Sequence, residues 1–457
     1  MENVKKGIQY VVYALIFVQI GLGIYWIFRN FMNIPCFGDS TEYIKLSESL
    51  QIDEYRTILY PLILKVAIAI QNRIHIPFLA LIYIGQFVLS FASIYYTCYV
   101  VLSDGKDSPE YTKLIIYTMG IITIPIINFL NFTILTDSLA LSFLLVILVQ
   151  IIKVWKSNKV RAGDVVLLAI AFLLEALMRA DRIYSCTLFL VVYSLIQLAK
   201  HVDWKRFAIV VAVILLTAGS AFGINRQTQT KGLYNRVETN FDFILLDRVV
   251  WPNMAANYDD FSSEIKETIS FEEAVKFDEH NNNVMYYLAP KVEERVGKER
   301  ASQMYREMAK VVWKNEPGKV ILDTAKCFLG FLFPHTNAYL SYRGWTETNN
   351  GWNLHCWSMV TPQLSDGYFH YYTFVFGIVL FAVAILVSII RLTVLKDEGF
   401  AHYIKGLVPY FSMAVLICAW FSLGDGAPPN DRYVTLCHLV WNLFIYGTLV
   451  DLQNVKK

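Results

Sequence analysis

The sequence predicts an all-α polytopic membrane protein with about ten transmembrane helices. Of its 457 residues, 56% are hydrophobic and only 17% are charged, whereas about a quarter of an ordinary soluble chain is charged. The apolar residues form runs of roughly 17 to 25, the length that a helix needs to cross about 30 Å of hydrocarbon. Between the runs, basic residues gather in short clusters that all fit one topology. A net charge of +2 spread over such clusters gives no reason to expect nucleic acid as a partner.

Ten apolar runs are predicted to span the membrane. They are residues 8–28, 77–101, 112–130, 134–152, 165–179, 183–199, 207–224, 370–395, 406–423 and 433–451. The first run is longer than a typical signal-peptide core, and no A-x-A-like cleavage site follows it before Asp39. We therefore expect it to remain in the protein as an anchor.

The basic clusters predict the orientation, because lysine and arginine are enriched in short cytoplasmic loops. The clusters that fall on one side are Lys5 and Lys6; Lys153, Lys156, Lys159 and Arg161; Lys200, Lys205 and Arg206; Arg391, Lys396 and Lys405; and Lys456 and Lys457. This side is predicted to be the cytoplasm. Residues 29–76 and 225–369 are then outside, together with three short turns near Asn131, Arg179 and Asp425.

The predicted topology divides the chain into three parts: a transmembrane module over residues 1–224, an outer domain over 225–369, and C-terminal transmembrane helices over 370–457. Helical periodicity and many charges predict that residues 225–318 are mainly helical. Residues 319–335 are apolar enough to enter the membrane. If they crossed it fully, the next basic loop would lie on the outer side. We expect them to form a re-entrant or interfacial helix.

The first outer loop, residues 36–66, is the most informative stretch. Asp39 follows the end of the first span, and Ser40 or Thr41 can cap a short helix. The residues that then recur at helical spacing are Glu42, Tyr43, Leu46 and Leu50. This pattern predicts a carboxylate at the membrane surface, at the start of an amphipathic helix. The alternative is that Asp39 is only a helix cap.

Further charges lie where they are costly. Asp137 opens the fourth predicted span, and Arg179, Asp181 and Arg182 form an outer turn too short to reach open water easily. Such groups normally pair or face a water-filled cavity, and they often mark a functional site. A structural ion pair, such as Asp181 with Arg182, is the alternative interpretation.

Several of these charges are predicted to reach the same outer boundary of the membrane. They are Asp39, Arg56, Asp137, Arg179, Arg182 and Arg432. This convergence on one face, more than any single residue, predicts a site.

The order of these features resembles the GT-C superfamily of glycosyltransferases, which includes the protein O-mannosyltransferases and the lipid A aminoarabinose transferases. The resemblance covers the first 225 residues best. The matching features are Gly38, Asp39 and Tyr43 after the first span; Arg56, Tyr60 and Pro61 before an apolar run; Asp137; Arg179; and Asp431, Arg432 and Tyr433 before the last span.

The resemblance implies transfer of a sugar from a polyprenyl-phosphate donor to an acceptor glycan, lipid or protein, with inversion at the anomeric carbon. Asp39 is then the general base that takes the acceptor proton. Arg56 and Arg179 hold the donor phosphate, because a guanidinium binds phosphate through two parallel hydrogen bonds. Arg182 and Arg432 are further candidates for the same role. The supporting residues are Glu42, Tyr43, Tyr60, Asp137, Asp181 and Tyr433.

An outward-facing site has no supply of nucleotide sugars, so a soluble donor is disfavoured. No HExxH or CxxC pattern is present, and the first loop holds no Asp-x-Asp, so we expect no required metal cofactor. Asp39 with Asp137 could still hold one divalent cation.

Residues 336–372 are rich in tryptophan, tyrosine, asparagine and glycine. This composition is equally consistent with an interfacial aromatic belt and with a platform that stacks on sugar rings. Of the seven cysteines, only Cys36 and Cys356 fall in predicted outer loops, where a disulfide is an open alternative. The other five lie in or near apolar segments, as small buried side chains do.

Two other functions compete with an enzyme. In a secondary transporter or lipid flippase, the buried charges would form a relay near the middle of the spans. In a scaffold, the outer domain would bind a partner and the charged loop would be incidental. Short loops favour a bacterial inner membrane, with the site facing the periplasm and serving cell-envelope polysaccharide.

Overall fold

A computed structural model describes most of the chain. The described residues are 2–31, 38–50, 56–103, 109–229, 242, 245–275, 284–332, 343–349, 352–358, 366–424 and 435–450.

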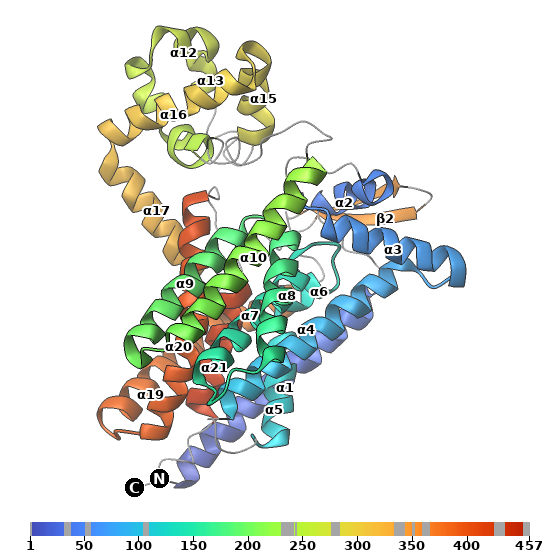
Figure 1. The fold of residues 1–457 in the computed structure, drawn as a ribbon, viewed down its shortest axis with the longest axis vertical. Coiled ribbons are helices and arrows are strands. Elements are labelled where there is room, and N and C mark those ends of the chain that lie inside the picture. Colours follow the sequence, from blue (N-terminus) through green and yellow to red (C-terminus); the bar gives the residue numbers. More distant parts are fainter. Residues whose placement is uncertain are drawn as a thin grey trace. The chain divides into compact units, whose positions relative to one another are not determined.

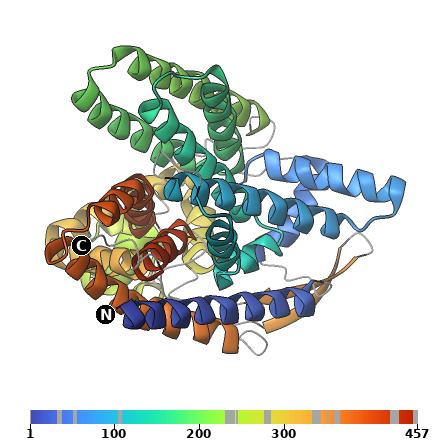
Figure 2. The same ribbon diagram turned by 90° about the horizontal axis from the view of Figure 1, so that it is seen from below.

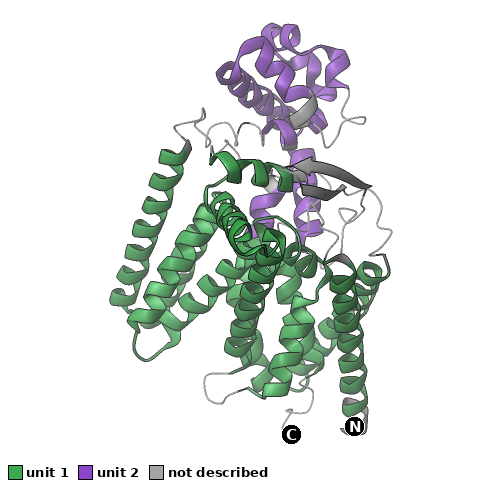
Figure 3. Ribbon diagram, turned by 90° about the vertical axis from the view of Figure 1, so that its right-hand side faces the viewer, with its two compact units in different colours: residues 1–232, 333–416, 431–457 green, residues 233–332, 417–430 purple. Residues whose placement is uncertain are grey.

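The chain forms two compact units, coloured separately in Figure 3. Unit 1 comprises residues 1–232, 333–416 and 431–457. Unit 2 comprises residues 233–332 and 417–430. The second unit therefore covers much of the predicted outer domain.

Unit 1 is a helical bundle with one β-hairpin (Figure 1). Its elements are α1 (Glu2–Asn30), α2 (Gly38–Ser49), α3 (Leu59–Ile74), α4 (Phe78–Leu102), α5 (Tyr111–Ile122), α6 (Pro125–Asn131), α7 (Asp137–Lys156), α8 (Ala162–Met178), α9 (Arg182–His201), α10 (Trp204–Gln229), β1 (Arg343–Asn349), β2 (Trp352–Ser358), α18 (Asp366–Tyr371), the π-helix η5 (Tyr372–Leu380), α19 (Phe381–Thr393), most of α20 (Glu398–Gly424) and α21 (Thr435–Leu449).

Within the described residues, seven helices are long and apolar enough to cross a membrane. They are Lys6–Arg29, Phe78–Leu102, Asp137–Lys156, Arg182–His201, Trp204–Thr228, Gly367–Thr393 and Glu398–Ser422. Each overlaps one predicted span. The chain is therefore an integral multi-pass membrane protein, in contact with a lipid bilayer.

The predicted count of about ten spans is not confirmed. The run 112–130 is broken into α5 and α6, which meet at an angle of 75°. Counted as one span, this pair raises the total to eight among the described residues. The break falls before Pro125, which has no N–H to donate and whose ring clashes with a preceding helical turn. The runs 165–179 and 433–451 form α8 and α21. With 17 and 15 described residues, these two helices are too short to be counted among the seven.

Helix α7 is the most buried of the seven, since 83% of its apolar stretch is buried inside the protein. It packs against both α4 and α8. In Figure 2, α1 (dark blue) lies along one side of unit 1, and α9 and α10 (green) lie on the other. Helix α7, whose first turn carries Asp137, thus packs against one helix that precedes it in the sequence and one that follows it.

Two helices occupy the first predicted outer loop. Helix α2 carries Asp39 in its first turn, and α3 projects sideways from the bundle in Figures 1 and 2. One face of α3 is buried through Tyr60 and Leu64, while the opposite stripe, which includes Leu62 and Val66, is exposed. With 16 residues, α3 is shorter than the roughly 20 residues that a membrane-spanning helix needs.

A β-hairpin is present where the sequence analysis expected helical or irregular structure. Strands β1 and β2 pair antiparallel, with Arg343 opposite Ser358 and Asn349 opposite Trp352. The dipeptide between the strands, Asn350-Gly351, is typical of a tight hairpin turn. The other described elements of unit 1 are helices, as the sequence predicts. Strand β2 contacts α2.

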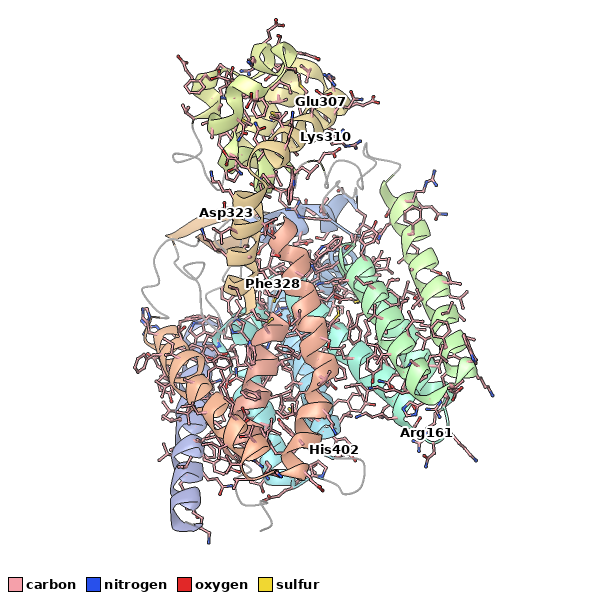
Figure 4. The ribbon with its side chains drawn as sticks, turned by 90° about the vertical axis from the view of Figure 1, so that its left-hand side faces the viewer. Arg161, Glu307, Lys310, Asp323, Phe328 and His402 are labelled. Atoms are coloured by element: carbon pink, nitrogen blue, oxygen red, sulfur yellow. The ribbon has the colours of Figure 1, made fainter. Side chains whose placement is uncertain are left out.

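The end of unit 1 where α19 meets α20 holds a buried arginine, Arg391, that donates hydrogen bonds from all three of its nitrogens. The Arg391 guanidinium donates to Asp397 Oδ2 at 2.8 and 2.7 Å and to the Thr448 carbonyl at 3.0 Å. Asp397 Oδ1 accepts from the Phe400 amide at 3.0 Å, at the start of α20. Figure 4 shows Arg161 and His402 at this end too, as the predicted topology requires.

Unit 2 folds around its own core. Its elements are η1 (Leu246–Val250), η2 (Trp251–Asn253), η3 (Ala255–Asp260), α12 (Ser263–Thr268), α13 (Phe271–Ala274), α15 (Val284–Val296), α16 (Lys298–Asn315) and α17 (Pro317–Leu332). Trp251, Leu288, Met304 and Met308 are fully buried in this core. The apolar face of α16 supplies much of it, which explains the helical periodicity of this segment.

Helix α17 is the segment predicted to be re-entrant or interfacial. Ile321 and Leu322 on it are exposed, and Asp323 pairs with Lys326 at 3.3 Å. Figure 4 shows Asp323 and Phe328 on this helix. It is absent from the seven apolar helices above, and its place in the membrane stays a prediction.

Candidate functional site

Two side-chain hydroxyls tie the first outer loop to the bundle. Ser40 Oγ on α2 donates to the Ile134 carbonyl at 2.9 Å, in the non-helical stretch before α7. Thr57 Oγ1 donates to the Met178 carbonyl at 2.9 Å, at the end of α8. Both hydroxyls are buried. These bonds bring the loop that carries Asp39 and Arg56 onto the helix ends that carry Asp137 and Arg179.

Asp39 and Arg56 form an ion pair. Arg56 Nη2 lies 3.2 Å from Asp39 Oδ1, and the two side chains are 15% and 35% exposed. The Arg56 guanidinium also lies 5.3 Å from the centre of the Tyr43 ring, within the range of a cation–π contact. The more exposed partner is the carboxylate, so Asp39 is open to solvent on one side.

Asp137 and Arg179 form a second, more deeply buried pair. Arg179 Nη1 donates to Asp137 Oδ1 at 2.6 Å, and the Asp137 side chain is only 2% exposed. Asp137 is the first residue of α7, where the helix dipole favours a negative charge. Arg179 immediately follows α8, so the pair joins the ends of two antiparallel neighbours.

Asp181 gives Arg179 a second carboxylate. Arg179 Nε donates to Asp181 Oδ1 at 3.3 Å. Burial opposes the charged form of Asp181, but the guanidiniums of Arg179 and Arg182 outweigh it and hold the pKa of Asp181 below its usual value. Asp181 is therefore ionised, and Arg179 lies between two carboxylates.

Tyr43 lies between the two pairs. Its ring meets the Tyr60 ring edge-on, with centroids 5.1 Å apart. Its hydroxyl is within hydrogen-bonding reach of Thr136 and within the electric field of Asp39, Asp137 and Arg179. Burial and the two nearby carboxylates raise the pKa of Tyr43, so the phenol stays neutral.

Arg182 faces inward instead. Its Nε lies 3.8 Å from Glu175 Oε1 on α8, and 4.0 Å from Asp181 Oδ2. The Glu175 side chain is completely buried. The predicted pairing of Asp181 with Arg182 is thus the longer contact of Asp181, since Arg179 lies closer. Arg182 therefore faces the buried Glu175 within the bundle.

Some predicted site residues are not part of this cluster. Glu42 is half exposed and pairs with Lys45 on the same helix at 3.4 Å. Asp431, Arg432 and Tyr433 lie outside the described residues, as does Cys36. The aromatic stretch 336–372 is described only in part, and the belt and platform interpretations both stay predictions.

The remaining predictions concern thiols and metals. Cys98, Cys186, Cys327, Cys418 and Cys437 are buried thiols outside any disulfide, as their apolar surroundings predicted. Within the described ranges, no three or more His, Cys, Asp or Glu side chains are grouped as a metal site would require. The single divalent cation between Asp39 and Asp137 stays a prediction.

Sequence reasoning missed two buried polar residues at the site. Gln86, in the middle of α4, bonds both Tyr60 and the stretch between α6 and α7. Ser138 Oγ donates to Asn131 Oδ1 at 2.6 Å across the same stretch. An uncharged amide inside an apolar run was the available signal, because a polar group within a membrane span is costly.

The chain is thus a multi-pass helical membrane protein in which Arg56, Arg179 and Arg182 each lie within 4.0 Å of a carboxylate. Arg179 follows the end of α8 and Arg182 begins α9, whereas Arg56 pairs with Asp39 on α2. Comparison with known protein families, curated proteins and solved structures finds no match. The glycosyltransferase resemblance therefore depends on the residues themselves.

Proposed function

We propose that the chain is a membrane glycosyltransferase that moves a sugar from a polyprenyl-phosphate donor to an acceptor hydroxyl or amine. The observation that carries the proposal is the meeting of Asp39, Arg56, Asp137 and Arg179 around Tyr43. These residues come from four separate segments. A partly exposed carboxylate beside one guanidinium, in a cluster that holds a second guanidinium, is the combination that inverting transfer from a phosphate ester needs.

Asp39 acts as the general base. Its carboxylate takes the proton from the acceptor O–H or N–H group as that atom attacks the anomeric carbon. The bond from the anomeric carbon to the phosphate oxygen breaks, and polyprenyl phosphate leaves with the electron pair. A well-placed base of this kind contributes about 10² to 10⁴ in rate. The 35% exposure of Asp39 leaves room for the acceptor on one side.

Arg56 and Arg179 bind the donor phosphate in this mechanism. Arg56 bonds Asp39 through Nη2, and a donor phosphate can replace the carboxylate on this guanidinium. When the phosphate attracts Arg56, Asp39 loses a neighbouring positive charge and becomes a stronger base. Donor binding thus prepares the base for the acceptor.

The positions of the charges favour an enzyme over a transporter or lipid flippase. Asp137 is the first residue of α7, Arg179 directly follows α8, and Arg182 opens α9. A relay for ions would place them near the middle of the spans. A scaffold offers no physical reason for the buried Asp137–Arg179 pair to meet the exposed Asp39–Arg56 pair.

The test is turnover by the purified full-length protein with a polyprenyl-phosphate sugar and a mixture of glycan, lipid and peptide acceptors. We expect Asp39→Asn to abolish turnover while the thermal midpoint stays unchanged. Asp164→Asn is the matched control, because Asp164 also lies in the first turn of a helix and pairs with a cation, Lys153, at 3.9 Å. Undiminished turnover in Asp39→Asn would remove the base assignment.

Donor binding tests the arginines separately. We expect Arg179→Ala to weaken donor binding or turnover by about 2 kcal/mol, which is the usual loss for a charge-assisted partner. Equal donor affinity in the variant and the parent would exclude this role. Uptake of a labelled solute, or movement of a lipid between leaflets, without sugar transfer would support the transporter or flippase instead.

A further inference from the structure

Gln86 is a buried polar residue in an apolar helix. It is 1% exposed and stands eight residues after the start of α4, about 12 Å along the helix axis. An amide at such a depth costs free energy unless all its hydrogen-bonding groups are satisfied.

The amide nitrogen of Gln86 faces three backbone carbonyls. Nε2 lies 3.2 Å from the Leu130 oxygen, 3.0 Å from the Asn131 oxygen and 3.0 Å from the Thr133 oxygen. Carbonyl oxygens only accept hydrogen bonds, so this end of the side chain must be the NH₂ group. Oε1 then faces Tyr60, whose hydroxyl donates to it at 2.8 Å.

Two of these carbonyls, those of Leu130 and Asn131, end α6, and the third, that of Thr133, lies in the irregular stretch that leads to Asp137. Helix α6 ends at Asn131 and α7 begins at Asp137, so carbonyls at the end of α6 have no intrahelical donor. In apolar surroundings they need another donor, and Gln86 supplies it. Gln86 thereby fixes the path of the chain into Asp137.

The other end of Gln86 reaches the first outer loop. The Tyr60 ring, oriented by its hydroxyl bond to Gln86, meets the Tyr43 ring edge-on at 5.1 Å. Tyr43 in turn lies 5.3 Å from the guanidinium of Arg56, the partner of Asp39. Gln86 thus bonds Tyr60, on the side of the Asp39–Arg56 pair, and also bonds carbonyls of the stretch that leads to Asp137.

We propose that Gln86 is a positioning residue that holds the Asp39–Arg56 pair in register with the Asp137–Arg179 pair. Its catalytic consequence rests on the glycosyltransferase function proposed above. Gln86 touches neither the donor nor the acceptor, and it acts through Tyr60 on one side and through the carbonyls on the other.

Tyr60→Phe separates this role from simple capping of α6. The variant removes only the hydroxyl that bonds Gln86, and it leaves the ring contact with Tyr43 and the three carbonyl bonds. If Gln86 only caps α6, Tyr60→Phe has no effect on turnover. If Gln86 positions the two pairs, kcat at saturating donor falls by about tenfold or more.

Gln86→Leu and the double variant complete a cycle. We expect Gln86→Leu to lower kcat at least as much as Tyr60→Phe, and the double variant to be no slower than Gln86→Leu within about twofold. The matched control is a part-buried glutamine–tyrosine bond elsewhere in unit 1, from Gln150 Nε2 to Tyr96 Oη at 3.0 Å, in the half of α7 that leads to Lys153. Gln150→Leu and Tyr96→Phe should lower the thermal midpoint similarly and leave kcat unchanged.

A second measurement does not need turnover. Backbone amide exchange of residues 56–60 should accelerate by about fivefold or more in both Gln86→Leu and Tyr60→Phe, and not in the Gln150 variants. Parental exchange of these amides in Tyr60→Phe, or parental kcat, would overturn the positioning role. If the parent shows no transfer at all, the proposed function fails, and the exchange measurement alone decides whether Gln86 holds the loop.

Discussion

The Asp137–Arg179 pair permits a quantitative test of how much the cluster contributes to stability. The perturbation is a double-mutant cycle with Asp137→Asn and Arg179→Met. Removing the arginine leaves the Asp137 carboxylate, with a side chain 2% exposed, without the guanidinium that donates to it at 2.6 Å. Loss of one partner of a buried pair costs about 3 to 5 kcal/mol. The helix dipole at the start of α7 offsets about 0.5 kcal/mol or more, so we expect roughly 3 kcal/mol.

The reverse change should cost less. In Asp137→Asn, Arg179 keeps Asp181 at 3.3 Å and is itself 12% exposed, so we expect about 1 to 2 kcal/mol. The double variant should be more stable than the sum of the two losses predicts, by a coupling of about 1.5 kcal/mol or more. The control cycle is Lys153 with Asp164, which are 3.9 Å apart and partly exposed, with an expected coupling under about 0.5 kcal/mol.

The assay is reversible unfolding in mixed micelles, titrated with a denaturing detergent and followed by tryptophan fluorescence. A coupling of less than about 0.5 kcal/mol between Asp137 and Arg179 would refute the reasoning, because a short, buried and charge-assisted bond would then contribute no more than a surface pair.

Three further predictions test other parts of the structure. Gly447→Ala should destabilise unit 1 by about 1 to 3 kcal/mol in the same unfolding assay, because a methyl group there would overlap the Tyr403 ring, whereas Gly85→Ala, with open space around it, should cost nothing; equal effects would contradict the close packing. The hydrogen bond from Arg295 lowers the pKa of Glu273, so this bond stabilises unit 2 fully above the unfolded pKa of about 4.3 and loses its effect as the pH falls below that value. Amide exchange of residues 263–275 should therefore accelerate at low pH in the parent and depend less on pH in Glu273→Gln. A cysteine replacing the exposed Glu272, in a chain with Cys36→Ser and Cys356→Ser, should react with an impermeant thiol reagent from outside the cell; reaction from the cytoplasm alone would invert the topology.

Much of the transmembrane fold could be predicted because long apolar runs have few alternatives to a spanning helix. The bend between α5 and α6 was missed although Pro125 signals it, since hydropathy averages over a single proline. Helix α3 was treated only as part of an outer loop, because its apolar stripe is too short to resemble a span. The hairpin β1–β2 was missed because residues 336–372 were interpreted by their composition alone, although Asn350-Gly351 is a hairpin signal.

The candidate site could be predicted as a set of charges but not as a set of pairs. Sidedness alone indicated that Asp39, Arg56, Asp137 and Arg179 reach one boundary. Which carboxylate meets which guanidinium depends on helix rotation and tilt, which hydropathy does not encode. Glu175, the buried partner of Arg182, was missed because one acidic residue near the end of an apolar run is indistinguishable from a terminal surface charge.

The π-helical segment η5 has a consequence for comparing this chain with any relative. A π-helical turn contains one residue more than an α-helical turn, and one residue turns the following helix by about 100°. Tyr372 opens η5 and accepts a hydrogen bond from Asn442 at 2.7 Å, whereas α19, which follows it, carries Arg391 into its own buried network. A homologue that lacks one residue between Tyr372 and Leu380 could keep only one of these two anchor points in place. An alignment gap in this span would therefore mark a change of helix facing, and not a change of loop length.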